Sequence, residues 1–74
     1  MLFKEAITLR ILELCDNYIY TPNKLAESSA IAPSTLRAIL ANNVDNPSST
    51  IIFKICKILK IELKDFYDSP LFDM

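Results

Sequence analysis

Few side chains in this sequence could support catalysis or hold a metal. The chain contains no histidine, and its two cysteines, Cys15 and Cys56, are isolated residues within helical patterns. Zinc normally takes four Cys, His or carboxylate ligands, and a serine or cysteine nucleophile needs a neighbouring base. The chain also has no glycine, which argues against a glycine-rich phosphate loop. We therefore expect no catalytic residue, no metal, no cofactor and no small-molecule substrate, and we do not expect an enzyme. Both cysteines are expected to be small buried hydrophobic residues.

The most informative pattern lies in residues 21–40, which predict two short helices joined by a tight turn. Thr21 is a good N-cap, and Pro22 and Pro33 each suit the first turn of a helix, where a missing N–H costs nothing. Ile31 is expected in the turn as an apolar plug between the helices. Such a pair holds one helix across the other and can place it in a DNA groove.

Apolar residues at helical spacing predict further helices that position this pair. We expect helices, in chain order, at about 3–17, 22–28, 33–41, 48–60 and 61–67. A short apolar tail follows at 68–74. The inner faces of the first and fourth helices carry Ile7, Ile11, Leu14, Cys15, Ile52, Ile55, Cys56 and Leu59. The sequence thus predicts one all-α domain of five helices, spanning residues 1–74.

The ends of these helices must be closed without glycine. Asn42 or Asn43 can adopt the left-handed conformation that ends a helix, and Lys60 is expected to end the fourth helix. Glu62 and Asp65 are expected near the start of the fifth helix.

Length and composition narrow the class of protein. A chain of 74 residues forms one domain with a modest core, yet 51% of its residues are hydrophobic. This excess indicates a second buried surface, most simply a subunit contact. No apolar run is long enough to cross a membrane and no signal peptide is evident, so we expect a cytoplasmic protein. The net charge of −1 does not favour nucleic-acid binding, because such domains usually carry a basic excess.

The sequence resembles the Cro/C1-type helix-turn-helix family, also called the xenobiotic-response-element type, from about Ala6 to Tyr67. The residues that carry the resemblance are Leu25-Ala26, Ile31, Ser34-Thr35-Leu36, Ile39, Asn46-Pro47-Ser48, Ile52, Lys54-Ile55, Leu59, Ile61, Leu63 and Phe66. No single motif is specific, but the full series at this spacing is. The resemblance implies a compact five-helix lambda-repressor-like fold.

Several positions depart from the pattern of the family. Ala30 stands where glycine is common in the turn, and a left-handed alanine costs about 1 kcal/mol. Ala32 stands where Ser or Thr often caps the recognition helix, a loss of about 1 kcal/mol. Asn42 and Lys60 replace glycines that commonly follow helices. Pro22 replaces a glutamine that binds phosphate, which removes one expected DNA contact.

The resemblance implies that the recognition helix, 33–41, reads base edges in the major groove of double-stranded DNA. Arg37 could make a bidentate contact with guanine, and Ser34 could bond a base or a phosphate. Pro33 and Ala38 could contact a thymine methyl group. The expected phosphate ligands are Asn23, Lys24, Thr35, and backbone N–H groups around Asn42, Asn43 and Ser48. The lysines after residue 50 are expected away from the groove, and Asp45 is expected beside the DNA backbone.

So few cations imply weak binding by one subunit, and we therefore expect a homodimer on a two-fold site. The candidate dimer residues are Leu2, Phe3, Leu9, Leu12, Phe66, Tyr67, Leu71 and Phe72. The alternative for the last residues is a tail that folds back over the first helix.

The sequence and the resemblance support three functional hypotheses to different degrees. A sequence-specific transcriptional regulator of bacterial or phage (prophage) type is favoured. The alternative is an interaction module, antitoxin-like or anti-repressor-like, that keeps the fold with weak or no DNA binding; the low positive charge, Pro22 and Asp45 favour it. An enzyme is a distant third.

Overall fold

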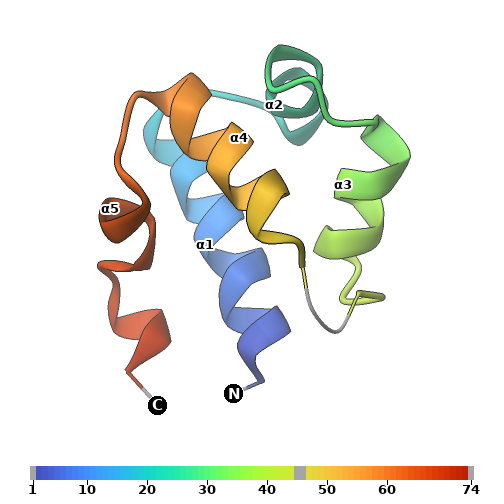
Figure 1. Ribbon diagram of the computed structural model, residues 1–74. Helices are drawn as coiled ribbons and strands as arrows, with labels where there is room; N and C mark the ends of the chain where they lie inside the picture. The colour runs from blue at the N-terminus through green and yellow to red at the C-terminus, as the bar shows by residue number, and fades with distance from the viewer. Residues whose placement is uncertain (1, 45–46, 74) are drawn as a thin grey trace.

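The structure, a computed structural model, describes residues 2–44 and 47–73 (Figure 1). Its elements are α1 (Phe3–Asn17), α2 (Pro22–Ser28), α3 (Pro33–Leu40), α4 (Ser49–Leu59), α5 (Leu63–Tyr67) and a 3-10 helix, η1 (Pro70–Phe72). The described residues contain no strand, so the predicted five-helix all-α fold is confirmed. Within them, no helix combines the length and the apolar content that crossing a membrane requires. Asp45 and Asn46, which the sequence predicts in a loop, lie outside the described residues.

Polar side chains close the starts of α2, α4 and α5, as the sequence predicts. The Lys24 N–H donates to Thr21 Oγ1 at 3.2 Å at the start of α2, and the Thr50 N–H donates to Ser48 Oγ at 3.1 Å at the start of α4. At α5, the Glu62 N–H donates to Asp65 Oδ2 at 2.9 Å. The first turn of α3 follows Ala32 and has no side-chain cap.

Four helices end in the same way although the chain has no glycine. Ile19, Ala30, Asn42 and Lys60 have φ between 56° and 60°, the left-handed region. In each case the next residue donates its N–H to the carbonyl five residues earlier, at 2.8–3.0 Å. This is the hydrogen bond of the Schellman motif. The left-handed Ala30, Asn42 and Lys60 match the sequence analysis, whereas Ile19 was not foreseen.

The core lies where α1 meets α2, α3 and α4. Figure 1 shows α4 in front of α1, with α2 and α3 on one side and α5 on the other. The completely or almost completely buried apolar residues include Ile7, Ile11, Leu14, Leu25, Leu36, Ile39, Ile52, Ile55, Leu59 and Phe66. The helix pair is thus held on a continuous apolar base.

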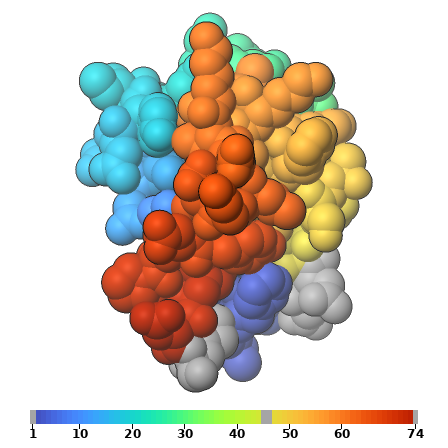
Figure 2. All heavy atoms as spheres, turned by 60° about the vertical axis from the view of Figure 1, so that its left-hand side comes forward, coloured from blue at the N-terminus to red at the C-terminus, as the bar shows by residue number. Residues whose placement is uncertain are grey.

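The C-terminal segment folds back onto the first helix. η1 packs against α1, and Figure 2 shows α5 and the tail beside the start of α1 on one face of the molecule. The rings of Phe3 and Phe72 have centroids 6.3 Å apart. The alternative reading of the tail, packing over the first helix, is therefore confirmed.

Arg10 joins α1 to the end of α5, a role that sequence analysis did not assign. Its Nε donates to the Phe66 carbonyl oxygen at 2.7 Å, and its Nη2 donates to the Asp65 carbonyl oxygen at 2.8 Å. The same guanidinium pairs with Glu13 one turn along α1. One side chain thereby satisfies two terminal carbonyls of a five-residue helix.

Candidate nucleic-acid interface

One buried apolar side chain anchors the turn between α2 and α3 to the core. Ile31 is 6% exposed, and its N–H donates to the Ala26 carbonyl oxygen at 2.9 Å. Leu25 and Ala26 are completely buried, so the two helices meet closely at this point. The predicted helix-turn-helix, with Ile31 as its plug, is confirmed.

The side of α3 opposite the core presents the residues predicted to read DNA. Leu36 and Ile39 face the core, while Pro33, Ser34, Thr35 and Arg37 are exposed and Ala38 is half-buried. Arg37 forms no ion pair or hydrogen bond with another described residue. An unpaired guanidinium keeps both edges available for bidentate recognition. Its contact with a base stays a prediction.

The predicted phosphate ligands on α2 are also exposed. Asn23 and Lys24 lie in its first turn, and the Lys24 ammonium group forms no ion pair or hydrogen bond within the described part of the chain. Its backbone N–H is occupied by Thr21, so only the side chain can reach a ligand. Phosphate contacts by the Asn23 and Lys24 side chains stay a prediction.

The backbone after α3 requires a correction. The Asn42 N–H donates to the Ile39 carbonyl oxygen and the Asn43 N–H to the Ala38 carbonyl oxygen, each at 3.0 Å. These N–H groups close α3 and are not free for a phosphate. The sequence predicts that Asn42 or Asn43 ends this helix, and a Schellman end occupies the N–H groups of both residues, which rules out the phosphate role expected of them.

The Asn42 side chain is likewise engaged, through a buried threonine of α1. Thr8 Oγ1 lies 2.9 Å from both the Ile39 carbonyl oxygen and Asn42 Oδ1, and its hydroxyl proton is shared between them. Thr8 therefore fixes the end of α3 to α1. Both asparagines are exposed, but Asn42 Oδ1 is engaged by Thr8, so the Asn43 side chain is the better candidate for a DNA contact.

Ser48 caps α4 with its side chain, as described above, and is itself exposed. The N–H of Ser49, at the first position of α4, has no acceptor within its own helix. The start of α4 thus keeps a backbone N–H group that could donate to a phosphate, as predicted for the region around Ser48. Asp45, expected beside the DNA backbone, lies outside the described residues.

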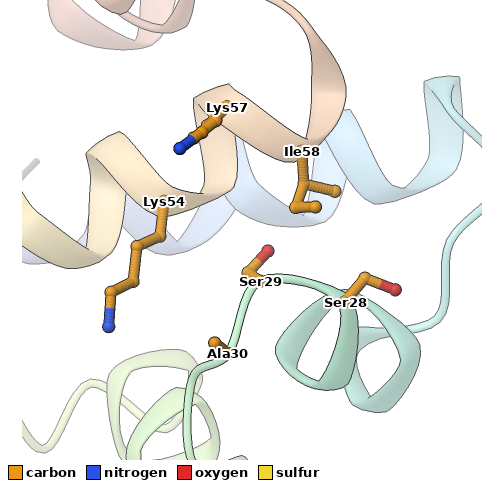
Figure 3. Close-up of a pocket in the computed structure, with 6 residues that line it drawn as sticks. All are labelled: Ser28, Ser29, Ala30, Lys54, Lys57 and Ile58. Carbon is orange, nitrogen blue, oxygen red and sulfur yellow. The ribbon is translucent and has the colours of Figure 1, made fainter.

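Two lysines of α4 lie nearer the helix pair than expected. Lys54 and Lys57 line a cavity of about 300 Å³ together with Ser28, Ser29, Ala30 and Ile58 (Figure 3). The sequence predicts them away from the DNA groove, because it does not show which flank of α4 faces the turn. Their spacing of three residues on a helix of known inner face was the signal that could have found them.

The candidate dimer residues separate into two groups. Leu2, Phe3, Leu9, Leu12 and Tyr67 are exposed at 36–61% of their surface. The other three candidates are buried or half-buried: Phe66, Leu71 and Phe72.

Phe66 is completely buried and cannot form a surface, which corrects its assignment. Its ring centroid lies 5.2 Å from that of Tyr67 and 6.2 Å from that of Phe72, so it anchors an aromatic cluster beneath the tail. Leu71 and Phe72 are half-buried in the same packing. A five-residue helix is too short for periodicity to identify its inner face, which explains the error.

The cysteines are buried and free, as expected of small hydrophobic residues. Burial raises the pKa of both thiols, and the Asp65 carboxylate raises that of Cys56 further. Both effects disfavour the thiolate, which is the reactive form.

Comparison with protein families agrees with this geometry. Residues 10–70 match the Cro/C1-type HTH DNA-binding domain, a match that includes the helix pair, α4 and α5. No curated protein and no solved structure matches the chain significantly. Since the family match covers most of the chain, this protein belongs to the Cro/C1-type helix-turn-helix DNA-binding domains.

Proposed function

We propose that this protein is a sequence-specific transcriptional regulator of bacterial or phage type that acts in the cytoplasm. The observation that carries the proposal is the exposed side of α3, whose Arg37 has no partner among the described residues, on a helix pair fixed to the core by Ile31 and Thr8. Domains of this family bind DNA and are typically not enzymes.

In this proposal α3 enters the major groove and its contacts divide by chemistry. Arg37 reads guanine through two parallel hydrogen bonds, and Ser34 bonds a base or a phosphate. Pro33 and Ala38 contact thymine methyl groups. Phosphate contacts that fix the orientation come from Asn23, Lys24, Thr35, the Asn43 side chain and the start of α4 near Ser48.

The small number of cations supports action as a homodimer. The net charge is −1, and each phosphate contact contributes only about one unit to the salt dependence of binding. Two subunits on half-sites about one helical turn apart make twice as many DNA contacts as one subunit, with the same residues. The exposed apolar residues of α1 supply a surface for pairing.

The test is a selection of binding duplexes from a random pool, followed by mobility shifts at low salt. We expect Arg37→Ala to weaken binding to the selected duplex about tenfold or more and to relax the preference at one base pair. A bidentate contact with guanine is worth about 1–3 kcal/mol of discrimination. Lys64→Ala is the matched control, because Lys64 is an exposed cation on α5, on the other side of the molecule from α3 (Figure 1).

A selection without any enriched sequence, or binding that is indifferent to Arg37, contradicts the proposal. That result favours the second candidate, an interaction module of antitoxin-like or anti-repressor-like type. The observation behind it is the low positive charge of the helix pair, where Lys24 and Arg37 are the only cations.

A further inference from the structure

The cavity between the helix-turn-helix and α4 has a lining suited to an anion. Ser28, Ser29 and Ala30 come from the end of α2 and the turn, and Lys54, Lys57 and Ile58 come from α4. In Figure 3 the Lys54 side chain extends from α4 towards the level of Ala30, and the Ser29 hydroxyl points towards α4. None of these six described residues carries a negative charge.

The two lysines have no counter-charge of their own. Lys54 and Lys57 lie three residues apart on one helix, a spacing at which like charges repel. Neither forms an ion pair or a hydrogen bond with another residue in the described part of the chain. An anion between them would relieve this repulsion.

Ser29 supplies an independent observation. It is 5% exposed, and its Oγ is the buried side-chain oxygen or nitrogen that lacks a hydrogen-bond partner among the described residues. Buried hydroxyl groups are nearly always hydrogen-bonded, because an unpaired one loses its bonds to water. Rotation between staggered positions about Cα–Cβ can aim this hydroxyl at a ligand in the cavity.

We propose that this cavity binds a phosphate group. The Lys54 and Lys57 ammonium groups supply the positive charge, and the Ser29 hydroxyl donates to one phosphate oxygen. Phosphate carries up to two negative charges at neutral pH and several acceptor oxygens, which matches these donors. The group comes either from the DNA backbone, as a phosphodiester with one negative charge, or from a free phosphorylated molecule, since both present non-bridging phosphate oxygens as acceptors.

The direct test is a titration of the isotope-labelled protein with inorganic phosphate, followed by amide NMR shifts. Sodium chloride at equal ionic strength is the reference. We expect phosphate-specific, saturable shifts at residues 28–30 and at Lys54, Lys57 and Ile58. Shifts that chloride reproduces, or none at these residues, overturn the proposal. The titration contains no DNA, so its outcome is independent of the regulator proposal.

Variants assign the roles. We expect Lys54→Gln and Lys57→Gln each to weaken phosphate binding about tenfold, since a charged hydrogen bond is lost, while the control Lys64→Gln leaves it unchanged. Ser29→Ala is expected to weaken phosphate binding and, without phosphate, to raise Tm by about 4 °C, because an unpaired buried hydroxyl is removed. If Ser29→Ala binds phosphate as well as the parent protein, or if Lys64→Gln weakens binding equally, the proposal fails.

A second arm identifies the source of the phosphate. If a DNA phosphate occupies the cavity, Lys54→Gln lowers the salt slope of DNA binding by about 1, and inorganic phosphate competes with DNA. If the source is a free molecule, the salt slope stays unchanged while the phosphate-specific shifts remain. Both results support a phosphate site and differ only in its occupant.

Discussion

Ile19 adopts the left-handed conformation that suits a β-branched residue least. Its φ is 58°, and its side chain is 93% exposed, so no packing offsets the strain. The turn is instead held by the following residue, whose N–H donates to the Cys15 carbonyl oxygen at 2.8 Å. The left-handed conformation of Ile19 therefore costs free energy, which the other interactions of the turn offset.

Replacing Ile19 should stabilise the protein. Ile19→Asn is expected to raise the free energy of unfolding by about 1 kcal/mol, because Asn tolerates this conformation. Thermal and urea unfolding provide the measurement. Ile19→Val is the control, since it keeps the branched Cβ and should give no gain; an equal gain from Val would mean that backbone strain is not the cause.

Thr8 is the residue whose loss should loosen the recognition helix. Thr8→Val keeps the shape but removes the hydroxyl that serves the Ile39 carbonyl and Asn42, and we expect a loss of about 1–2 kcal/mol in the free energy of unfolding. Faster hydrogen exchange at the end of α3 should accompany it. Thr50→Val, at an exposed residue of α4, is the control and should change neither quantity. Unaltered exchange in Thr8→Val would show that α1 does not restrain α3 through this contact.

At the scale of the elements, the short helices depend on partners outside themselves. α5 has five residues and is far below the length at which a helix is stable alone. Arg10 from α1 and the aromatic cluster formed by Phe3, Phe66, Tyr67 and Phe72 supply what its own hydrogen bonds cannot.

Arg10 is therefore expected to control the stability of the C-terminal segment. Arg10→Lys keeps the charge but loses the paired N–H groups, and we expect a loss of about 1–2 kcal/mol. Hydrogen exchange should rise most in residues 63–72. Arg37→Lys, at an exposed and unpaired arginine, serves as the control and should leave stability unchanged. A uniform rise in exchange over the whole chain would show that Arg10 does not act on this segment in particular.

The sequence predicted the helices better than the way in which they pack against one another. Thr21, Pro22 and Ile31 carry local signals for a cap, a first turn and a plug, and all three have these roles. Ile19 could not be predicted, because its own preference opposes its conformation. The positions of Phe66 and Lys54 depend on how elements pack, which local spacing does not encode.

At the scale of the molecule, the exposed apolar residues of α1 are the remaining candidates for a subunit contact. Leu9 and Leu12 are 43% and 41% exposed, and no described part of the chain covers them further. Packing of the tail accounts for part of the apolar excess, while Phe53 and Ile19 are exposed elsewhere on the surface.

Charging this surface should abolish association. We expect Leu9→Lys with Leu12→Lys to convert a dimer to a monomer in sedimentation at tens of micromolar. The fold should persist, because each new lysine lies four residues before an acidic residue, Glu13 or Asp16. Phe53→Lys, at a residue 60% exposed on α4, is the control and should remain dimeric. A parent protein that sediments as a monomer contradicts the dimer itself.

The four left-handed helix ends have a consequence for how this domain can change. Each of them is occupied by a residue other than glycine, so a better-suited residue is available at several independent positions. Stabilising changes at Ile19 and Lys60, which follow α1 and α4, lie away from α3 and can compensate for destabilising substitutions on its exposed side. The domain thus has room to acquire a new base preference, through mutations at Ser34 or Arg37, without falling below the stability that folding requires.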